Sequence, residues 1–323
     1  MTITAFLFPG QGSQYAGMGR DLYDRFDEAR RIIDAADDVL GFPLSETMFS
    51  RPGQENGDDA LQQTNVTQPA LYVHSLAASA VIRKYGLNPA MAAGHSLGEY
   101  SALAAAGALS FDDGLRLVHR RGQLMAAAGR ERPGAMAAVL GLDDEVVAGL
   151  CSDATEVRSV VVAANFNAPG QVVVSGDVEA VERVMELSRE HGARRVVPLA
   201  VSGAFHSPLM ETARAGLERA LAGVGILRPE FPIVLNVTAK PTREPDEIRR
   251  RLLEQLTAPV RWSQTLREMH AAGAGRFVEV GAGRVLTGLT RRTLGQGVET
   301  ATADTADDAA SLAGRNPAAK QDA

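Results

Sequence analysis

The sequence predicts an α/β fold in which a mostly parallel sheet holds the functional site and a second, smaller α/β unit is inserted. Three observations support this prediction. Residues 3–13 read as an apolar strand that ends in a glycine-rich turn, residues 89–108 read as strand, tight turn and helix, and residues 134–201 form a compact block of alternating strands and helices.

The first elements in order are typical of a parallel sheet. The apolar run at 3–8, ITAFLF, has the length of a buried strand, and the following PGQGS at 9–13 exposes backbone N–H groups in a turn. Residues 68–85 carry apolar side chains at helical spacing, among them Leu71, Leu76 and Ile82. A short strand at 89–93 then leads through a glycine-flanked turn into a helix of small residues at 99–108, as in a βα unit.

The pattern changes between residues 134 and 201. The predicted elements there are strand 134–140, helix 143–151, strand 159–164, strand 171–176, helix 178–191 and strand 194–200. The order β-α-β-β-α-β is typical of a ferredoxin-like fold. Strand-like runs resume at 233–236 and 276–280, so this block is predicted to be an insertion that forms one wall of a cleft.

We therefore divide the chain into an α/β-hydrolase-like catalytic subdomain, residues 1–132 and 202–296, and a ferredoxin-like small subdomain, residues 133–201. The tail at 297–323 is rich in Ala, Asp and Thr without an apolar period, and we predict that it is disordered.

Composition narrows the possible functions. The chain has 323 residues, 45% of them hydrophobic, and a formal charge of −6, which argues against a nucleic-acid-binding protein. The single cysteine, Cys151, cannot form an intrachain disulfide, fits a reducing compartment and reads as a small buried hydrophobic residue. Neither a basic leader nor an apolar run of 18 residues is present, so we expect a cytoplasmic protein without membrane contact.

Ser96 is the candidate nucleophile. Residues 94–98 read GHSLG and fit G-x-S-x-G, in which the glycines permit a sharp turn between strand and helix that exposes the serine hydroxyl. The N-terminus of the following helix adds a favourable dipole at the same place. A chance match in an unrelated turn is the alternative, and the predicted strand before the motif and helix after it favour the functional interpretation.

His206 is the candidate general base. The six histidines are His74, His95, His119, His191, His206 and His270. His95 is adjacent to Ser96 in the chain, so the two side chains are expected to point apart. His206 lies in a Gly- and Pro-containing segment, SGAFHSP at 202–208, that reads as a loop, whereas the remaining four lie in helical patterns. A lone histidine in a loop is more often a solvated residue than a catalyst, so composition alone does not settle this assignment.

Arg121 is the candidate anion-binding residue. It falls on the apolar stripe formed by Leu117, Val118 and Met125 of a predicted helix, where a positive charge is out of place. One interpretation is an arginine that binds an anionic ligand. The other is an arginine that extends to solvent or pairs with a structural carboxylate.

Several motifs together resemble one family, the malonyl-CoA:acyl-carrier-protein transacylases. The matching stretches are FPGQGSQ at 8–14, GHSLGEY at 94–100, RRGQLM at 120–125, NFNAPGQ at 165–171, AFHS at 204–207, QLTAPVRW at 255–262 and EVGAG at 279–283. They occur in order over residues 3–295, and the tail lies outside the likeness.

The resemblance implies roles for the site residues. Ser96 would be the nucleophile and His206 the base, and the main-chain carbonyl of Gln255 would orient the histidine in place of an aspartate. The backbone N–H groups of Gln11 and Leu97 would form the oxyanion hole.

The resemblance also implies the substrate. Arg121 would bind the free carboxylate of a malonyl group. Phe205 would narrow the space beside the acyl α-carbon and favour malonyl over α-branched groups, although Gly203 departs from the histidine common in related polyketide acyltransferase domains. Plain packing is the other interpretation of Phe205.

The expected activity is thus transfer of a malonyl group from coenzyme A, through a Ser96 acyl-enzyme, to the phosphopantetheine thiol of an acyl carrier protein. No bound cofactor, metal ion or nucleic acid is expected, and the family likeness favours a monomer. A serine thioesterase that removes acyl groups from carrier proteins is the main alternative, because its first half-reaction is the same. A non-catalytic carrier-docking module is a third, which the intact Ser96, His206 and Arg121 disfavour.

Overall fold

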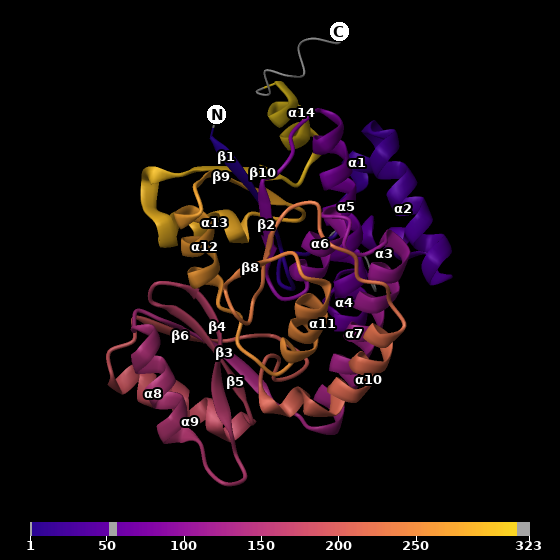
Figure 1. Cartoon of the computed structure of the whole chain (residues 1–323). Helices are drawn as coiled ribbons and strands as arrows, with labels where there is room; N and C mark the ends of the chain where they lie inside the picture. Colours follow the sequence, from indigo (N-terminus) through magenta and orange to yellow (C-terminus); the bar gives the residue numbers. More distant parts are fainter. Residues whose placement is uncertain (1, 52–56, 315–323) are drawn as a thin grey trace.

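The computed structural model describes residues 2–51 and 57–314, and the strands in these ranges form two sheets (Figure 1). The larger sheet has the order β10-β9-β1-β2-β7-β8, with every neighbouring pair parallel except β7 and β8. Its strands are β1 (Ile3–Phe8), β2 (Met91–Gly94), β7 (Ile233–Val234), β8 (Pro241–Thr242), β9 (Ala274–Val280) and β10 (Glu299–Ala303). The predicted parallel sheet is confirmed.

Both faces of the larger sheet are buried. Phe6 and Phe8 of β1 pack into one hydrophobic cluster, and their neighbours Ala5 and Leu7 pack into another, as the alternation of side chains along a strand requires. The helices around this sheet are α1 (Arg20–Arg25), α2 (Asp27–Leu40), α3 (Leu44–Met48), α4 (Gly57–Gln62), α5 (Thr64–Lys84), α6 (Gly98–Ala105), α7 (Phe111–Glu131), α10 (Glu211–Ala222), α11 (Pro245–Glu254), α12 (Trp262–Ala271), α13 (Val285–Leu294) and α14 (Ala306–Gly314). Short 3-10 turns are η1 (Pro208–Met210) and η2 (Gly295–Gly297).

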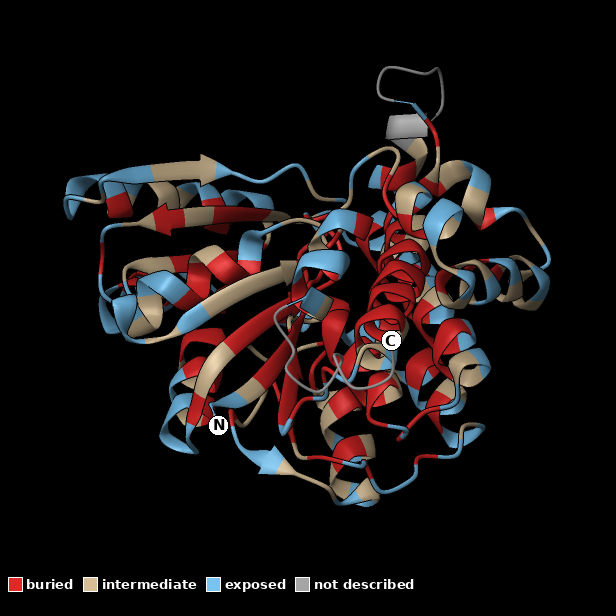
Figure 2. Ribbon diagram, turned by 90° about the horizontal axis from the view of Figure 1, so that it is seen from above, coloured by how far each residue is buried: buried red, intermediate tan, exposed pale blue. Residues whose placement is uncertain are grey.

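Helix α5 is the central helix of this unit. Buried residues follow one another along nearly its whole length, unlike those of α2, which alternate with exposed residues (Figure 2). It packs against α2, α6 and α7 and therefore has little polar surface. No helix in the described part of the chain is long and apolar enough to cross a membrane.

The smaller sheet is antiparallel with the order β4-β5-β3-β6. Its elements are β3 (Ala135–Leu140), α8 (Asp144–Ala154), β4 (Val161–Ala168), β5 (Gln171–Gly176), α9 (Val178–Glu190) and β6 (Arg195–Pro198). The predicted β-α-β-β-α-β order is confirmed, and the strand order is that of a ferredoxin-like fold. Cys151 of α8 is buried in the core between the helices and this sheet, and its burial raises the pKa of the thiol to about 12.

A short backbone contact joins the two units. The N–H of Phe166 in β4 donates to the carbonyl of Val260, and the N–H of Val260 donates to the carbonyl of Ala164, at 2.9 and 2.8 Å. This pairing holds the segment between α11 and α12 against the edge strand of the smaller sheet. The site described below includes Gln255 of the same segment.

The prediction of a disordered tail is wrong for residues 297–314. Strand β10 pairs in parallel with β9 from Glu299 to Ala303, and α14 buries Ala306, Ala309 and Leu312 against the core. The sequence pattern did not indicate these elements because alanines and threonines give no clear apolar period. Their small side chains nevertheless fit closely at a sheet edge. Residues 315–323 lie outside the described residues.

Candidate active site

The turn between β2 and α6 presents Ser96 with a strained backbone. Its φ is 51°, the left-handed region that L residues seldom adopt. A Cβ at Gly94 would lie 1.9 Å from the carbonyl of Gly98, and a Cβ at Gly98 would lie 2.0 Å from the carbonyl oxygen of Phe8. The two glycines are therefore needed for the close packing of turn, strand and helix.

Asn236, just after β7, holds this turn in place. Its Oδ1 accepts a hydrogen bond from the Ser96 N–H at 2.7 Å, and its Nδ2 donates to the Gly94 carbonyl at 2.7 Å. Asn236 is fully buried. The turn is thus fixed from the neighbouring strand and not by the glycines alone.

Ser96 and His206 form a hydrogen-bonded pair. Ser96 Oγ lies 2.8 Å from His206 Nε2, and His206 Nδ1 lies 2.8 Å from the main-chain oxygen of Gln255. A carbonyl oxygen can only accept, so Nδ1 carries the proton and Nε2 is free to accept one from the serine. The loop position of His206 is as predicted, and it too has a positive φ, 58°.

Burial lowers the pKa of His206 to about 3, and the nearby positive charge of Arg121 adds to this effect. Only 3% of the residue is exposed. The imidazole is therefore neutral at physiological pH, which is the form a general base requires.

Arg121 reaches the same place from α7. Its Nη2 donates to Ser96 Oγ at 3.2 Å and to Gln255 Oε1 at 2.9 Å, and its Nη1 donates to Gln68 Oε1 at 2.9 Å. The guanidinium carbon lies 5.4 Å from the centre of the Tyr100 ring. The side chain is 1% exposed, and among the described residues it has no carboxylate in ion-pair contact and no acceptor for its Nε.

These contacts bear on the alternative interpretation of Arg121 from the sequence. It neither extends to solvent nor pairs with a structural carboxylate, but is held by neutral amide and hydroxyl oxygens beside the serine. A buried cation with neutral partners is suited to an incoming anion.

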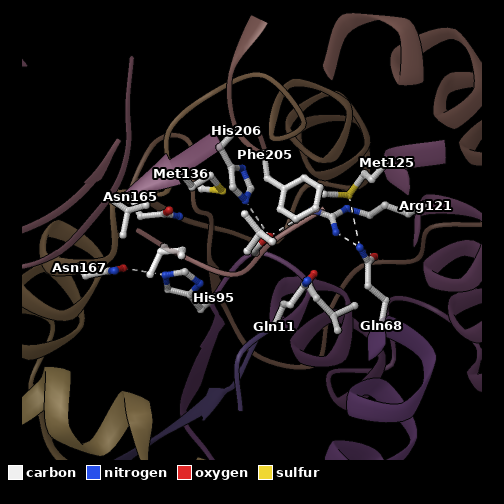
Figure 3. Close-up of a pocket in the computed structure, with 15 residues that line it drawn as sticks. Gln11, Gln68, His95, Arg121, Met125, Met136, Asn165, Asn167, Phe205 and His206 are labelled. Carbon is white, nitrogen blue, oxygen red and sulfur yellow. Dashed lines mark hydrogen bonds between the residues drawn. The ribbon is translucent and has the colours of Figure 1, made fainter. Parts of the chain in front are cut away.

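The pair opens into a cavity of about 170 Å³ between the two sheets (Figure 3). Its lining residues are Gln11, Gln68, His95, Ser96, Leu97, Arg121, Met125, Met136, Asn165, Asn167, Val173, Leu199, Val201, Phe205 and His206. All site residues predicted from the sequence line it except Gln255, which lies directly behind His206 and Arg121. No cluster of three or more metal-ligating side chains occurs in the described residues.

The two predicted oxyanion-hole residues line the same cavity as Ser96. Leu97 is the N-cap residue of α6, and Gln11 lies in the turn after β1. Within the described part of the chain, neither main-chain N–H donates a hydrogen bond to another protein group. The Gln11 side chain instead reaches Thr64 Oγ1 at 3.4 Å.

His95 is directed away from the serine, as expected for a residue adjacent in the chain. Its Nε2 lies 2.8 Å from Asn167 Oδ1 of β4, and its ring centre lies 5.4 Å from that of Trp262. Figure 3 shows His95 and Asn167 side by side at the rim of the cavity. The residue links the two units at the site.

Sequence reasoning assigned no role to several polar residues of the site, among them Gln68, Glu99 and Asn236. These three are at most 1% exposed. Gln68 begins an apolar helical stretch, and Asn236 directly follows a buried strand of a parallel sheet. Polar residues at such positions are a usable signal, because the carboxyl ends of parallel strands meet at one edge of a sheet.

Comparison with known proteins gives consistent results. Residues 5–316 match the family model described as acyl transferase domain. The chain is 43% identical over 292 residues to the malonyl CoA-acyl carrier protein transacylase of Bacillus subtilis, which covers 90% of each protein. The family match extends past residue 295, so the segment with β10 and α14 is part of the family and not an appended tail.

Solved structures show the same fold. An acyl carrier protein S-malonyltransferase from Vibrio cholerae is 40% identical, with a TM-score of 0.90 over 96% of this chain and 99% of that one. A malonyl-transacylase solved in complex with its type II PKS acyl-carrier protein is 39% identical, with a TM-score of 0.92 over 98% of this chain and 100% of that one.

Proposed function

We propose a route of acyl transfer for this chain, which belongs to the acyl transferase family of the malonyl CoA-acyl carrier protein transacylases. Ser96 takes a malonyl group from coenzyme A and passes it to the phosphopantetheine thiol of an acyl carrier protein. The observation that carries the proposal is the neutral Ser96–His206 pair beside a buried arginine that has no carboxylate partner among the described residues.

The first half-reaction follows from the hydrogen bonds. His206 Nε2 takes the hydroxyl proton as Ser96 Oγ attacks the thioester carbonyl carbon. The carbonyl oxygen becomes negative and is stabilised by the N–H groups of Gln11 and Leu97. When the intermediate collapses, the C–S bond breaks, His206 returns the proton to the coenzyme A thiolate, and an oxygen ester of malonate remains on Ser96.

The second half-reaction reverses these steps with a different thiol. His206 takes the proton from the phosphopantetheine thiol of the carrier, and the thiolate attacks the malonyl ester. Collapse then releases Ser96, which regains its proton from His206. The Gln255 carbonyl keeps Nδ1–H in place throughout, so the imidazole presents Nε2 in both directions.

Arg121 selects malonyl over acetyl groups. The malonyl carboxylate can accept charge-assisted hydrogen bonds from the unpartnered Nε and from Nη2 in place of Ser96 Oγ, while Gln68 and Gln255 keep their contacts with the guanidinium. An acetyl group offers no such partner and leaves the buried cation as it is. Discrimination between the two acyl groups therefore depends on one side chain in α7.

The thioesterase alternative finds less support in this geometry. In the described residues His206 Nδ1 is held by a main-chain oxygen and not by an Asp or Glu side chain, unlike the Ser-Asp-His order of ordinary α/β-hydrolases. The buried His206 and Arg121 side chains beside Ser96 also suit a reaction from which water must be kept out.

The test is the intact mass of the protein after brief incubation with malonyl-CoA, acetyl-CoA or methylmalonyl-CoA. The wild type should gain one malonyl group and little acetyl or methylmalonyl, and Ser96→Ala should gain none. Addition of an acyl carrier protein with its phosphopantetheine arm should move the malonyl group to the carrier. Steady release of free coenzyme A and malonate without an adduct would instead indicate a hydrolase.

The remaining expectations are part of the same proposal. We infer a monomer that acts in the cytoplasm without a resident cofactor, with residues 133–201 as the small subdomain and residues 1–132 and 202–314 as the catalytic one. Size-exclusion chromatography with light scattering tests the monomer, for which one chain of 34.2 kDa is expected.

A further inference from the structure

Glu99 is a buried carboxyl group that the reaction above does not use. It lies in the first turn of α6, three residues after Ser96, and is 1% exposed. Its Oε2 accepts a hydrogen bond from Gln255 Nε2, while its Oε1 has no hydrogen-bond partner among the described residues. Burying a carboxyl group with an unpartnered oxygen is costly, and packing alone does not account for it.

Gln255 connects this carboxyl group to both parts of the site. Its main-chain oxygen accepts from His206, its side-chain Oε1 accepts from Arg121 Nη2 at 2.9 Å, and its Nε2 donates to Glu99 and to the Ser96 carbonyl, the latter at 3.0 Å. One residue therefore orients the base through its backbone and contacts the arginine through its side chain.

The amide of Gln255 can serve Arg121 in only one orientation. With Oε1 toward the guanidinium, an acceptor meets a donor. If the amide were rotated by 180°, its N–H₂ group would face the N–H groups of Arg121, and its oxygen would face the oxygen of Glu99. Glu99 Oε2 and the Ser96 carbonyl are both acceptors of Nε2, and together they disfavour the rotated form.

We propose that Glu99 is a positioning residue for substrate selection: it fixes the orientation of the Gln255 amide, which in turn holds Arg121 where it receives the carboxylate of the acyl group. This inference rests on the proposed function. It assigns Glu99 no contact with the substrate, and it separates selection, which runs through the side chain of Gln255, from the orientation of His206, which runs through its main chain.

The test compares acylation of Ser96 by malonyl-CoA and by acetyl-CoA in single-turnover experiments. Glu99→Leu removes the acceptor and should lower the malonyl rate about 5- to 30-fold, since one hydrogen bond to a charged group is disturbed indirectly. The acetyl rate should change less than about threefold, because the acetyl group makes no contact with Arg121. Glu99→Gln keeps an acceptor oxygen for Gln255 Nε2 and should restore most of the preference for malonyl.

A matched control separates selection from general destabilisation. Glu279 is another fully buried carboxyl group, held by the N–H groups of Leu286 and Thr287 in a different part of the fold. Glu279→Gln should lower the melting temperature without changing the ratio of malonyl to acetyl rates. A folded Glu99→Leu protein that keeps the wild-type ratio would overturn the inference.

Gln255→Leu provides an independent arm that does not depend on the folding of Glu99→Leu. It removes the amide and keeps the main-chain carbonyl, so it should reproduce the loss of malonyl preference. The double variant should lose no more of the malonyl preference than Gln255→Leu alone, because both changes act through the contact between Gln255 and Arg121. An unchanged ratio of malonyl to acetyl rates in Gln255→Leu, or full additivity in the double variant, would contradict the inference.

The same experiment distinguishes failure of this inference from failure of the proposed function. A wild type without preference for malonyl would contradict the proposed function, whereas a wild type with that preference and variants that keep it would contradict only the role of Glu99.

Discussion

The two walls of the cavity differ in chemistry. The wall from the larger sheet carries the reacting and charged groups, Ser96 and Arg121, with Gln68 behind them, whereas the wall from the smaller sheet contributes mostly apolar side chains, among them Met136 of β3 and Val173 of β5 (Figure 3). Polar groups that must react need fixed positions, and they lie at the carboxyl ends of parallel strands and the N-terminus of a helix. Apolar groups that only shape the space can come from a separate unit.

His206 joins the two walls, and its loss should have the largest effect. His206→Ala removes the base and should slow malonyl transfer to Ser96 about 10²- to 10⁴-fold, the usual contribution of general base catalysis. The measurement is the single-turnover acylation rate, with the melting temperature as a check of folding. Labelling at the wild-type rate would show that the serine is activated by another group.

Replacement of the planar guanidinium on the polar wall should have the next largest effect. Arg121→Lys keeps the charge and loses the planar fork, so kcat/KM for malonyl-CoA should fall about 10- to 100-fold while the acetyl rate changes little. Acylation rates with the two thioesters test this. Equal losses for malonyl and acetyl would mean that Arg121 acts on the Ser96–His206 pair and not on the acyl carboxylate.

A smaller effect is expected where the chain returns from the smaller sheet to the larger one. Phe205 lines the cavity there, and Phe205→Leu should raise the rate with methylmalonyl-CoA relative to malonyl-CoA about 3- to 10-fold, because the space for an added methyl group is worth about 1–3 kcal/mol. Phe277→Leu, a change at a buried phenylalanine of β9, is the matched control. If both variants keep the wild-type ratio, Phe205 only packs, and the apolar wall would have to set selectivity elsewhere.

The smallest change is expected with pH. The pKa of His206 lies near 3, so kcat/KM should stay flat as the pH falls from 8 to about 5. A fall in kcat/KM with an apparent pKa near 6.5, the ordinary value for imidazole, would show that the base is more exposed in solution than in this structure.

The lowered pKa of His206 also makes the folded protein less stable in acid, which is opposite to the effect of a salt-bridged histidine. Below about pH 6.5 the unfolded chain takes up a proton at His206 and the folded chain does not. The free energy of unfolding therefore decreases progressively as the pH falls from 6.5 toward 3.

The sequence predicted the parts of the fold that follow from local patterns. The order of elements between 134 and 201 and the strand, turn and helix around Ser96 are visible in apolar periodicity and glycine spacing. The sequence did not predict β10 and α14, because their small residues are ordered only by pairing with β9 and packing on the core. Asn236 and Glu99 were missed for a related reason: their partners, Ser96 and Gln255, are distant in the chain, so their roles depend on tertiary contacts.

The left-handed backbone at both Ser96 and His206 bears on attempts to make the protein more heat-resistant. Glycine adopts this conformation without steric cost, whereas a strained residue costs about 1–3 kcal/mol. A directed-evolution screen that rewards thermal tolerance alone would therefore enrich glycine at these two positions and deliver robust but inert protein. At these two residues the substitution that relieves backbone strain also removes the reacting side chain, so a useful screen must select for both stability and turnover.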